Sequence, residues 1–177
     1  MDRALLFGSV EYLAFLLLLL FSRGMDFLST WIATPNLILE ANPIARKLRW
    51  KWGIPVNLAL CLAFARWPLT AIIISTTSVL VASRNFQHAW LMRTHGEDNY
   101  RNWFTERLDE TPPGLFLLCL LAQTSLVAAV GSALIFFSRF EQEVPLGIGM
   151  GIVGYAMAVM IYTLIALVRN RRMARYR

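Results

Sequence analysis

Charged residues are scarce in this chain: 16% of its 177 residues are Asp, Glu, Lys or Arg, whereas 57% are hydrophobic. Soluble domains of this length carry about a quarter charged residues and interrupt their apolar runs with polar faces. Four apolar runs approach the roughly 20 residues that a bilayer core requires, namely 4–21, 69–82, 114–137 and 144–168. The composition therefore predicts an integral membrane protein.

Cysteine and histidine are also rare, with two residues of each type. Cys61 and Cys119 lie inside apolar runs, where a thiol behaves as a small hydrophobic group. His88 and His95 have no third ligand nearby in the sequence. We therefore expect no disulfide, metal or cofactor. The familiar hydrolase, metalloprotease, phosphate-binding and haem motifs are absent as well, which favours a protein without catalytic activity but leaves an enzymatic role open.

Basic residues outnumber acidic residues by 17 to 11, and they gather in three clusters. Such clusters beside spans mark the cytoplasmic face and attract anionic lipid head groups. Nucleic acid is excluded as a partner because most of the chain is lipid-soluble. The clusters are Arg46, Lys47, Arg49 and Lys51; Arg84, Arg93, Arg101 and Arg107; and Arg169, Arg171, Arg172, Arg175 and Arg177. We expect lipid head-group contacts from Arg46, Lys47, Arg49, Lys51, Arg84, His88 and Arg101.

Placing all three clusters inside the cell predicts an all-α bundle of about five spans in the inner membrane, with the N-terminus outside and the C-terminus cytoplasmic. The stretch 54–82 then crosses twice, turning at Trp67-Pro68. A four-span alternative bends a single helix at Pro68 and leaves one cluster on the outer side. The predicted single domain consists of a first span with a polar corner (1–53), a two-span hairpin (54–83), a cytoplasmic amphipathic segment (84–112), a second hairpin (113–168) and a basic tail (169–177).

Two further features of the bundle also follow from the sequence. Apolar residues recur at helical spacing over 97–108, which predicts an amphipathic helix on the inner leaflet after Gly96. In the last span, small residues at four-residue spacing allow a second helix to approach closely. That contact is either internal or a dimer face. The small residues are Gly147, Gly151 and Gly154.

A polar cluster interrupts the end of the first apolar segment. Arg23, Asp26 and Thr30 are spaced three and four residues apart, so a helix carries them on one stripe. A helix over 12–33 places this stripe inside the bilayer, where a carboxylate needs a cation, whereas a helix over 4–22 places it at the surface. A break at Gly24 is a third possibility.

Asn36, Glu40 and Asn42 follow after a short turn. Asn42-Pro43 predicts a helix start, with Asn as the cap and Pro at the first helical position. Glu40 can meet Asp26 across the turn, and oxygen ligands around two carboxylates suit a hard cation, a shared proton or an arginine. The competing interpretation is a buried ion-pair network with Arg23 or Arg46 that fixes the first hairpin.

The pattern Asp26-x-x-x-Thr30, followed by Glu40-x-Asn42-Pro43 ahead of another apolar span, resembles a family of small multi-pass prokaryotic membrane proteins of unknown function. The resemblance covers roughly the first half of the chain. It implies a compact helical membrane fold with an acidic, polar corner and no assigned chemistry.

Three functions are compatible with these observations. The first is a non-catalytic membrane protein that packs with itself or as an accessory subunit of a larger membrane complex. The second is a small ion- or proton-coupled transporter, or an ion-binding protein, that uses Asp26 and Glu40. The third is a membrane enzyme that acts on a lipid head group.

Overall fold

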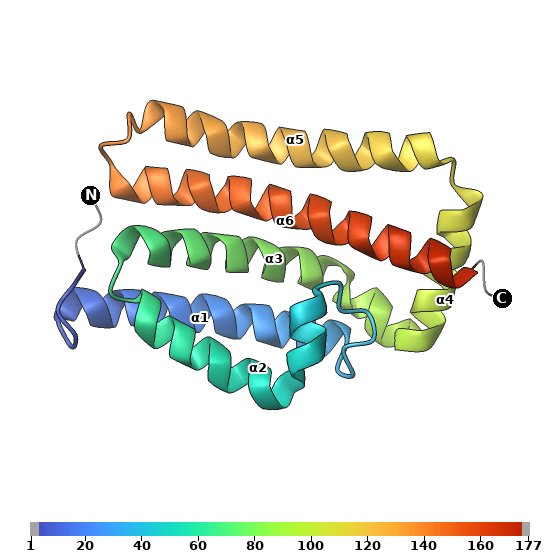
Figure 1. Ribbon diagram of the computed structural model, residues 1–177, viewed down its shortest axis with the longest axis horizontal. Helices are drawn as coiled ribbons and strands as arrows, with labels where there is room; N and C mark the ends of the chain where they lie inside the picture. The colour runs from blue at the N-terminus through green and yellow to red at the C-terminus, as the bar shows by residue number, and fades with distance from the viewer. Residues whose placement is uncertain (1–3, 175–177) are drawn as a thin grey trace.

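The computed structural model describes the backbone of residues 4–174 and the side chains up to residue 168, so the side chains of the basic tail lie outside the described part. Within that range all regular secondary structure is helical and there is no strand, which confirms the predicted all-α class. The helices are α1 (Val10–Ala33), α2 (Pro43–Phe64), α3 (Pro68–His95), α4 (Glu97–Glu110), α5 (Pro113–Phe137) and α6 (Glu143–Ala174) (Figure 1). By length and composition, α1, α3, α5 and the part of α6 up to Val168 can each cross a bilayer.

Four long helices lie side by side in the order α1, α3, α6, α5, and α2 lies against α1 (Figure 1). Helices α1, α3 and α6 run in one direction, whereas α2 and α5 run in the other (Figure 1). Two hydrogen bonds connect α2 and the residue just beyond it to the segments that flank α1. The amide of Leu5 donates to the carbonyl of Arg66 at 2.8 Å, and the indole of Trp50 donates to the carbonyl of Pro35 at 2.8 Å.

The interface between α1 and α3 is built from small side chains. On both helices the small buried residues are spaced three, four or seven positions apart, which keeps them on one stripe. Serine and alanine at such positions let two backbones approach closely, and this is how helices associate in membranes. The buried residues are Ser22, Ser29 and Ala33 on α1, and Ala71, Ser75, Ser78, Ala82 and Ala89 on α3.

The ends of the first helices follow from local sequence. The Ser9 hydroxyl accepts from the amide of Tyr12 and caps α1, which then runs unbroken through Gly24 to Ala33. The long frame for the first helix is therefore confirmed, and both the short frame and the break at Gly24 are wrong. Asn42 caps α2 as predicted, because its side-chain oxygen accepts from the two amides that follow Pro43.

Helix α2 contains a break that the sequence does not predict. Arg49 has φ 53° and ψ −175°, a conformation that costs a non-glycine residue of the order of 1–3 kcal/mol. It divides the helix into a short basic turn, 43–48, and a longer apolar part, 50–64. At about 1.5 Å per residue the apolar part is roughly 22 Å long. The basic residues of the first part keep α2 out of the four helices that can span by composition.

The glycines of α6 lie against neighbouring helices inside the protein. A methyl group on Gly147 would come within 2.8 Å of Ile72 on α3, and one on Gly151 would come within 2.6 Å of Thr76. On the opposite side of α6, a methyl on Gly149 would lie 2.7 Å from the carbonyl oxygen of Gly131 on α5. The small residues therefore let α6 pack closely between α3 and α5.

Gly151→Ala is expected to destabilise the protein by about 1–3 kcal/mol, because the added methyl also meets the carbonyl oxygen of Ile73 at 2.9 Å and the backbone has to move. Gly154→Ala is the matched control, because its methyl would meet only the Thr77 hydroxyl at an ordinary 3.7 Å. The measurement is the free energy of unfolding in mixed detergent micelles. Equal losses in both variants would contradict close packing at Gly151.

Candidate functional site

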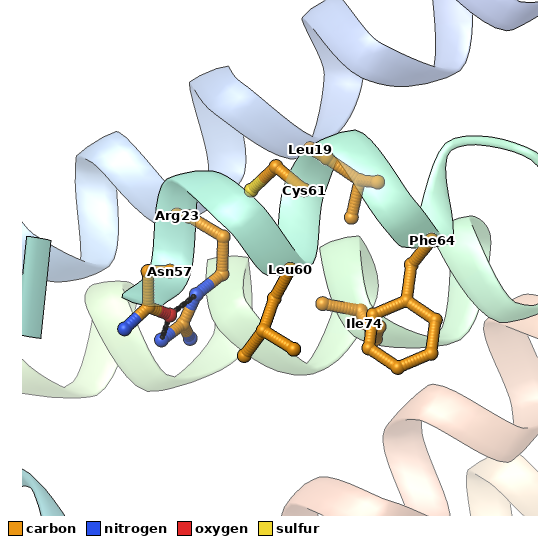
Figure 2. Close-up of a pocket in the computed structure, with 7 residues that line it drawn as sticks. All are labelled: Leu19, Arg23, Asn57, Leu60, Cys61, Phe64 and Ile74. Atoms are coloured by element: carbon orange, nitrogen blue, oxygen red, sulfur yellow. Dashed lines mark hydrogen bonds between the residues drawn. The ribbon is translucent and has the colours of Figure 1, made fainter. Parts of the chain in front are cut away.

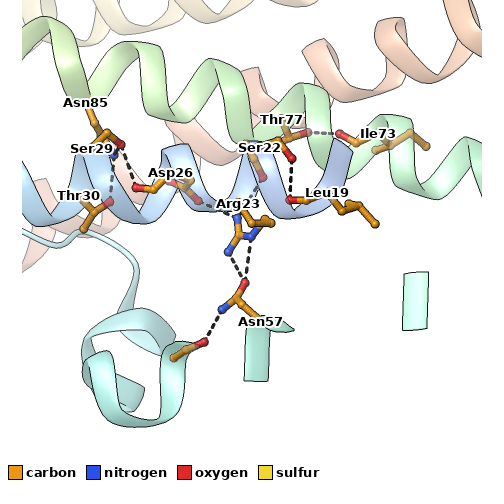
Figure 3. A network of polar contacts seen from close by, with 12 residues as sticks. Leu19, Ser22, Arg23, Asp26, Ser29, Thr30, Asn57, Ile73, Thr77 and Asn85 are labelled. Carbon is orange, nitrogen blue, oxygen red and sulfur yellow. Dashed lines mark hydrogen bonds and ion pairs between the residues drawn. The ribbon is translucent and has the colours of Figure 1, made fainter. Parts of the chain in front are cut away.

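The predicted stripe on α1 forms a hydrogen-bonded network around Arg23 (Figure 3). One terminal nitrogen, Nη1, donates to the Asp26 carboxylate at 2.7 Å and to the Ser78 hydroxyl on α3 at 3.1 Å. The Nε atom donates to the side-chain oxygen of Asn57 on α2 at 2.9 Å, and Nη2 donates to the same oxygen. Asn57 is itself oriented, because its amide donates to the carbonyl of Gly53 at 2.8 Å. One guanidinium therefore joins α1, α2 and α3.

The Arg23–Asp26 pair is largely removed from the surface, with side chains 27% and 17% exposed. A charge at this depth is tolerated only when it is paired, and the two groups together carry no net charge. Asp26 therefore has the cationic partner that a carboxylate inside a bilayer needs, and that partner is Arg23. The described residues contain no ion pair between Glu40 and either Arg23 or Arg46.

Further along α1, Asn85 of α3 joins the same stripe (Figure 3). Its amide nitrogen donates to the Ser29 hydroxyl at 3.3 Å and to the Thr30 hydroxyl at 3.2 Å. Thr30 therefore serves the contact between α1 and α3, one turn beyond the Arg23–Asp26 pair. In this geometry the Thr30 side chain has a structural role.

A second polar centre forms around Glu97, at the start of α4. Its carboxylate accepts from the Thr34 hydroxyl, from the Asn36 amide and side chain at 2.9 and 3.0 Å, and from the Ile38 amide at 3.0 Å. Leu37, between two of these donors, has φ 59°, which turns the chain around the carboxylate. The sequence grouped Asn36 with Asp26 and Glu40, whereas the structure gives its hydrogen bonds to Glu97.

The surroundings of Glu97 favour its ionised form. Burial alone raises the pKa of a carboxyl group, but the hydrogen bonds from Thr34, Asn36 and Ile38 together outweigh burial and hold the pKa of Glu97 below the ordinary 4.5. The carboxylate fastens the α1–α2 loop to the α3–α4 junction.

Glu40 is in the opposite situation. Burial is the main cause that raises its pKa above the ordinary 4.5, and the nearby Asp26 carboxylate raises it further. The amide of Asn42, which donates to Glu40 at 2.8 Å, and the charge of Arg46 lower it, but not enough to offset burial. Glu40 and Asp26 are therefore electrostatic neighbours, as the sequence predicts.

Glu40→Gln is expected to make the protein at least as stable as the wild type at neutral pH. Because the folded pKa of Glu40 is raised, folding favours the protonated side chain. The contribution of protonated Glu40 to the free energy of unfolding is complete below pH 4.5 and is lost as the pH rises through the folded pKa. Glutamine keeps an oxygen for the Asn42 amide and cannot ionise. Unfolding free energies between pH 4 and 8 should therefore converge at low pH, whereas the exposed Glu106→Gln should follow the wild type throughout.

The basic residues expected at lipid head groups flank these two centres. Arg46, Lys47, Arg49 and Lys51 are exposed at the start of α2, next to the loop that Glu97 holds. On α3 the ring Nδ1 of His88 lies 3.2 Å from the carbonyl oxygen of Arg84, and on α4 Arg101 pairs with Asp98 at 3.2 Å. Head-group contact stays a prediction for these residues.

Four members of the site lie outside the predicted cluster. Asn57 is a polar residue inside an apolar run, a signal that points to a hydrogen-bonding partner in a membrane helix. Ser78 lies in a run of four hydroxyl residues at 75–78. Such hydroxyls commonly bond back to carbonyls of their own helix, whereas the Ser78 hydroxyl accepts from Arg23. Glu97 is indistinguishable from the other charges on an amphipathic helix. The four residues are Asn57, Ser78, Asn85 and Glu97.

Within residues 4–174 no group of three or more His, Cys, Asp or Glu side chains is placed to hold a metal ion. No protein-family model, curated protein or solved structure matches this chain. The two polar centres and the exposed helix surfaces are therefore the features that bear on function.

Proposed function

We propose that this chain is a non-catalytic, five-span protein of the prokaryotic inner membrane that packs with itself or as an accessory subunit of a larger membrane complex. One observation carries the proposal: the polar groups within and beside the spans are used to hold helices together. Arg23 joins three helices, and Glu97 binds the first loop to α4. Groups committed in this way support a structural role.

Five spans are supported by the course of the chain. Because α1 and α3 run in the same direction and contact each other, the chain has to return across the bilayer between them. Helix α2 makes that return. Trp50, near its start, donates to the loop just after α1, and Arg66, just past its end, accepts from Leu5 in the segment that precedes α1. The short apolar part of α2 is compatible with a crossing where the bilayer thins locally. The exposed basic residues that begin α2 support a cytoplasmic position for this end of the bundle, where α6 also ends.

A partner surface is available on α5. Glycines of α6 are occupied inside the protein, whereas α5 packs mainly on α6 and carries a stripe of small residues on its exposed side. Ala122, Ser125 and Ala129 on this stripe are exposed, and small residues at such spacing favour helix association in bilayers.

The experiment is native mass spectrometry of the protein released gently from its own membranes. We expect a dimer or a stable partner subunit that survives Glu40→Gln and is lost in Ala129→Trp. Leu58→Trp, at an exposed position on α2, is the control for adding a tryptophan to the lipid-facing surface. A wild-type protein that is released only as a monomer would overturn the proposal.

An ion- or proton-coupled role is the second candidate, and the proximity of Asp26 and Glu40 favours it. Of these two carboxylates, Asp26 is paired with a cation, whereas Glu40 forms no ion pair among the described residues. In this case Glu40→Gln would abolish cation- or pH-driven uptake into vesicles while leaving the fold intact. The lipid-enzyme hypothesis gains no specific support from the geometry.

A further inference from the structure

A small cavity of about 140 Å³ lies between α1, α2 and α3, at the level of Arg23 (Figure 2). Most of its wall is apolar, and the polar groups are gathered at one end, where Arg23 meets Asn57 (Figure 2). The residues that line it are Leu19, Arg23, Asn57, Leu60, Cys61, Phe64 and Ile74.

The cavity opens on the side of the bundle. Asn57, Leu60 and Phe64 recur at three- and four-residue spacing on one face of α2, and Leu60 is 44% exposed. In a membrane this opening faces lipid, so its contents come from the bilayer. A volume of this size is below the roughly 300 Å³ of typical ligand pockets. It has room for the head of a lipophilic molecule, whose tail would remain among the lipids.

The guanidinium of Arg23 has one N–H more than the protein uses. Four of its five donors are committed: Nε to Asn57, Nη2 to Asn57, and Nη1 to both Asp26 and Ser78. No acceptor for the second Nη2 hydrogen is found among residues 4–174. Water satisfies such a donor at a protein surface, but in hydrocarbon an unsatisfied polar group costs several kcal/mol. A bound oxygen atom at the polar end of the cavity removes that cost.

The charges around Arg23 define which kind of oxygen atom fits. Asp26 already neutralises the guanidinium through a contact of 2.7 Å. An anionic head would share the guanidinium with the Asp26 carboxylate in a medium of low dielectric constant, where like charges repel strongly. An uncharged carbonyl accepts the free hydrogen without that repulsion.

We propose that the cavity binds the carbonyl head of a neutral lipophile from the bilayer, with Arg23 as the hydrogen-bond donor. This inference goes beyond the proposed assembly role and does not depend on it. The carbonyl could belong to a quinone ring or to the ester group of an acylglycerol, two sources with the same hydrogen-bonding chemistry.

Binding is measured on the full-length protein in dodecyl maltoside, by native mass spectrometry and by the ligand-induced shift in Tm. The probes are decylubiquinone and dioctanoylglycerol, with decylbenzene as the lipophile without an oxygen and decanoate as the anion. Leu60→Trp fills the cavity, and Leu58→Trp adds the same side chain on the same helix outside the lining. Ile74→Phe fills the cavity from α3 if Leu60→Trp fails to fold.

We expect at least one carbonyl probe to bind the wild type and Leu58→Trp at least tenfold more tightly than either cavity-filling variant. Binding of decylubiquinone alone assigns a quinone, and binding of dioctanoylglycerol alone assigns an acylglycerol. The proposal is overturned if neither probe binds, if the filled variants bind as well as the wild type, or if decylbenzene or decanoate binds as tightly as the carbonyl compounds.

Discussion

Arg23→Met is expected to destabilise the protein by about 3–5 kcal/mol. The substitution removes the cation from a pair whose side chains are 27% and 17% exposed, and breaking a buried pair leaves an uncompensated charge on the remaining partner. It also removes the donors to Asn57 and Ser78, so that three helices lose their common contact. The measurement is the free energy of unfolding in mixed micelles of dodecyl maltoside and dodecyl sulfate.

A double-mutant cycle measures the interaction between Arg23 and Asp26 separately from the other contacts that each residue makes. Arg23→Met with Asp26→Leu should cost less than Arg23→Met alone, because replacement of both charges by apolar groups leaves no unpaired carboxylate. The matched control is the exposed pair Arg101–Asp98, which has the same three-residue spacing on a helix. Arg101→Met should cause little measurable loss. If Arg23→Met is as mild as Arg101→Met, the network does not hold the bundle together.

The sequence was sufficient to predict features that depend on neighbouring residues. Asn42 and Pro43 begin α2, and α3 ends at His95 before Gly96, whereas for α1 the sequence offered three frames and the structure selected the one that ends at Ala33. Each of these depends on hydropathy, a cap or a proline within a few residues. The presence of a membrane bundle and the position of its polar corner follow from the same local signals.

Features that depend on distant residues were not predictable. The parallel pairing of α1 with α3 brings Arg23 to Ser78, 55 positions away, and no periodicity in a single sequence reports which two stripes meet. Glu97 contacts a loop about 60 positions earlier, and the left-handed backbone at Arg49 has no glycine to announce it. Tertiary packing alone determines these three features.

Glu97→Ala is expected to cost about 2–4 kcal/mol and to release the loop that follows α1. The Glu97 side chain is only 9% exposed, and its loss leaves donors from Thr34, Asn36 and Ile38 without their acceptor. Buried donors that lose their partner carry a desolvation cost of about 1–3 kcal/mol each, and entry of water into the shallow loop reduces the sum. Hydrogen exchange at the Asn36 and Ile38 amides should therefore accelerate in Glu97→Ala.

The pH dependence gives an independent test of the same carboxylate. Because the folded pKa of Glu97 lies below 4.5, its contribution to stability is complete above that pH and is lost as the pH falls through the folded pKa. The wild type should thus lose stability in this acidic window, whereas Glu97→Gln should lack that component. Asp98→Asn changes the neighbouring exposed carboxylate. In this variant the dependence of stability on pH should match that of the wild type, and hydrogen exchange at the Ile38 amide should remain slow. Slow exchange in Glu97→Ala would mean that the loop is held by other contacts, among them the bond from Trp50 to the Pro35 carbonyl. The two readouts together therefore distinguish a carboxylate that fastens the loop from one that only lies beside it.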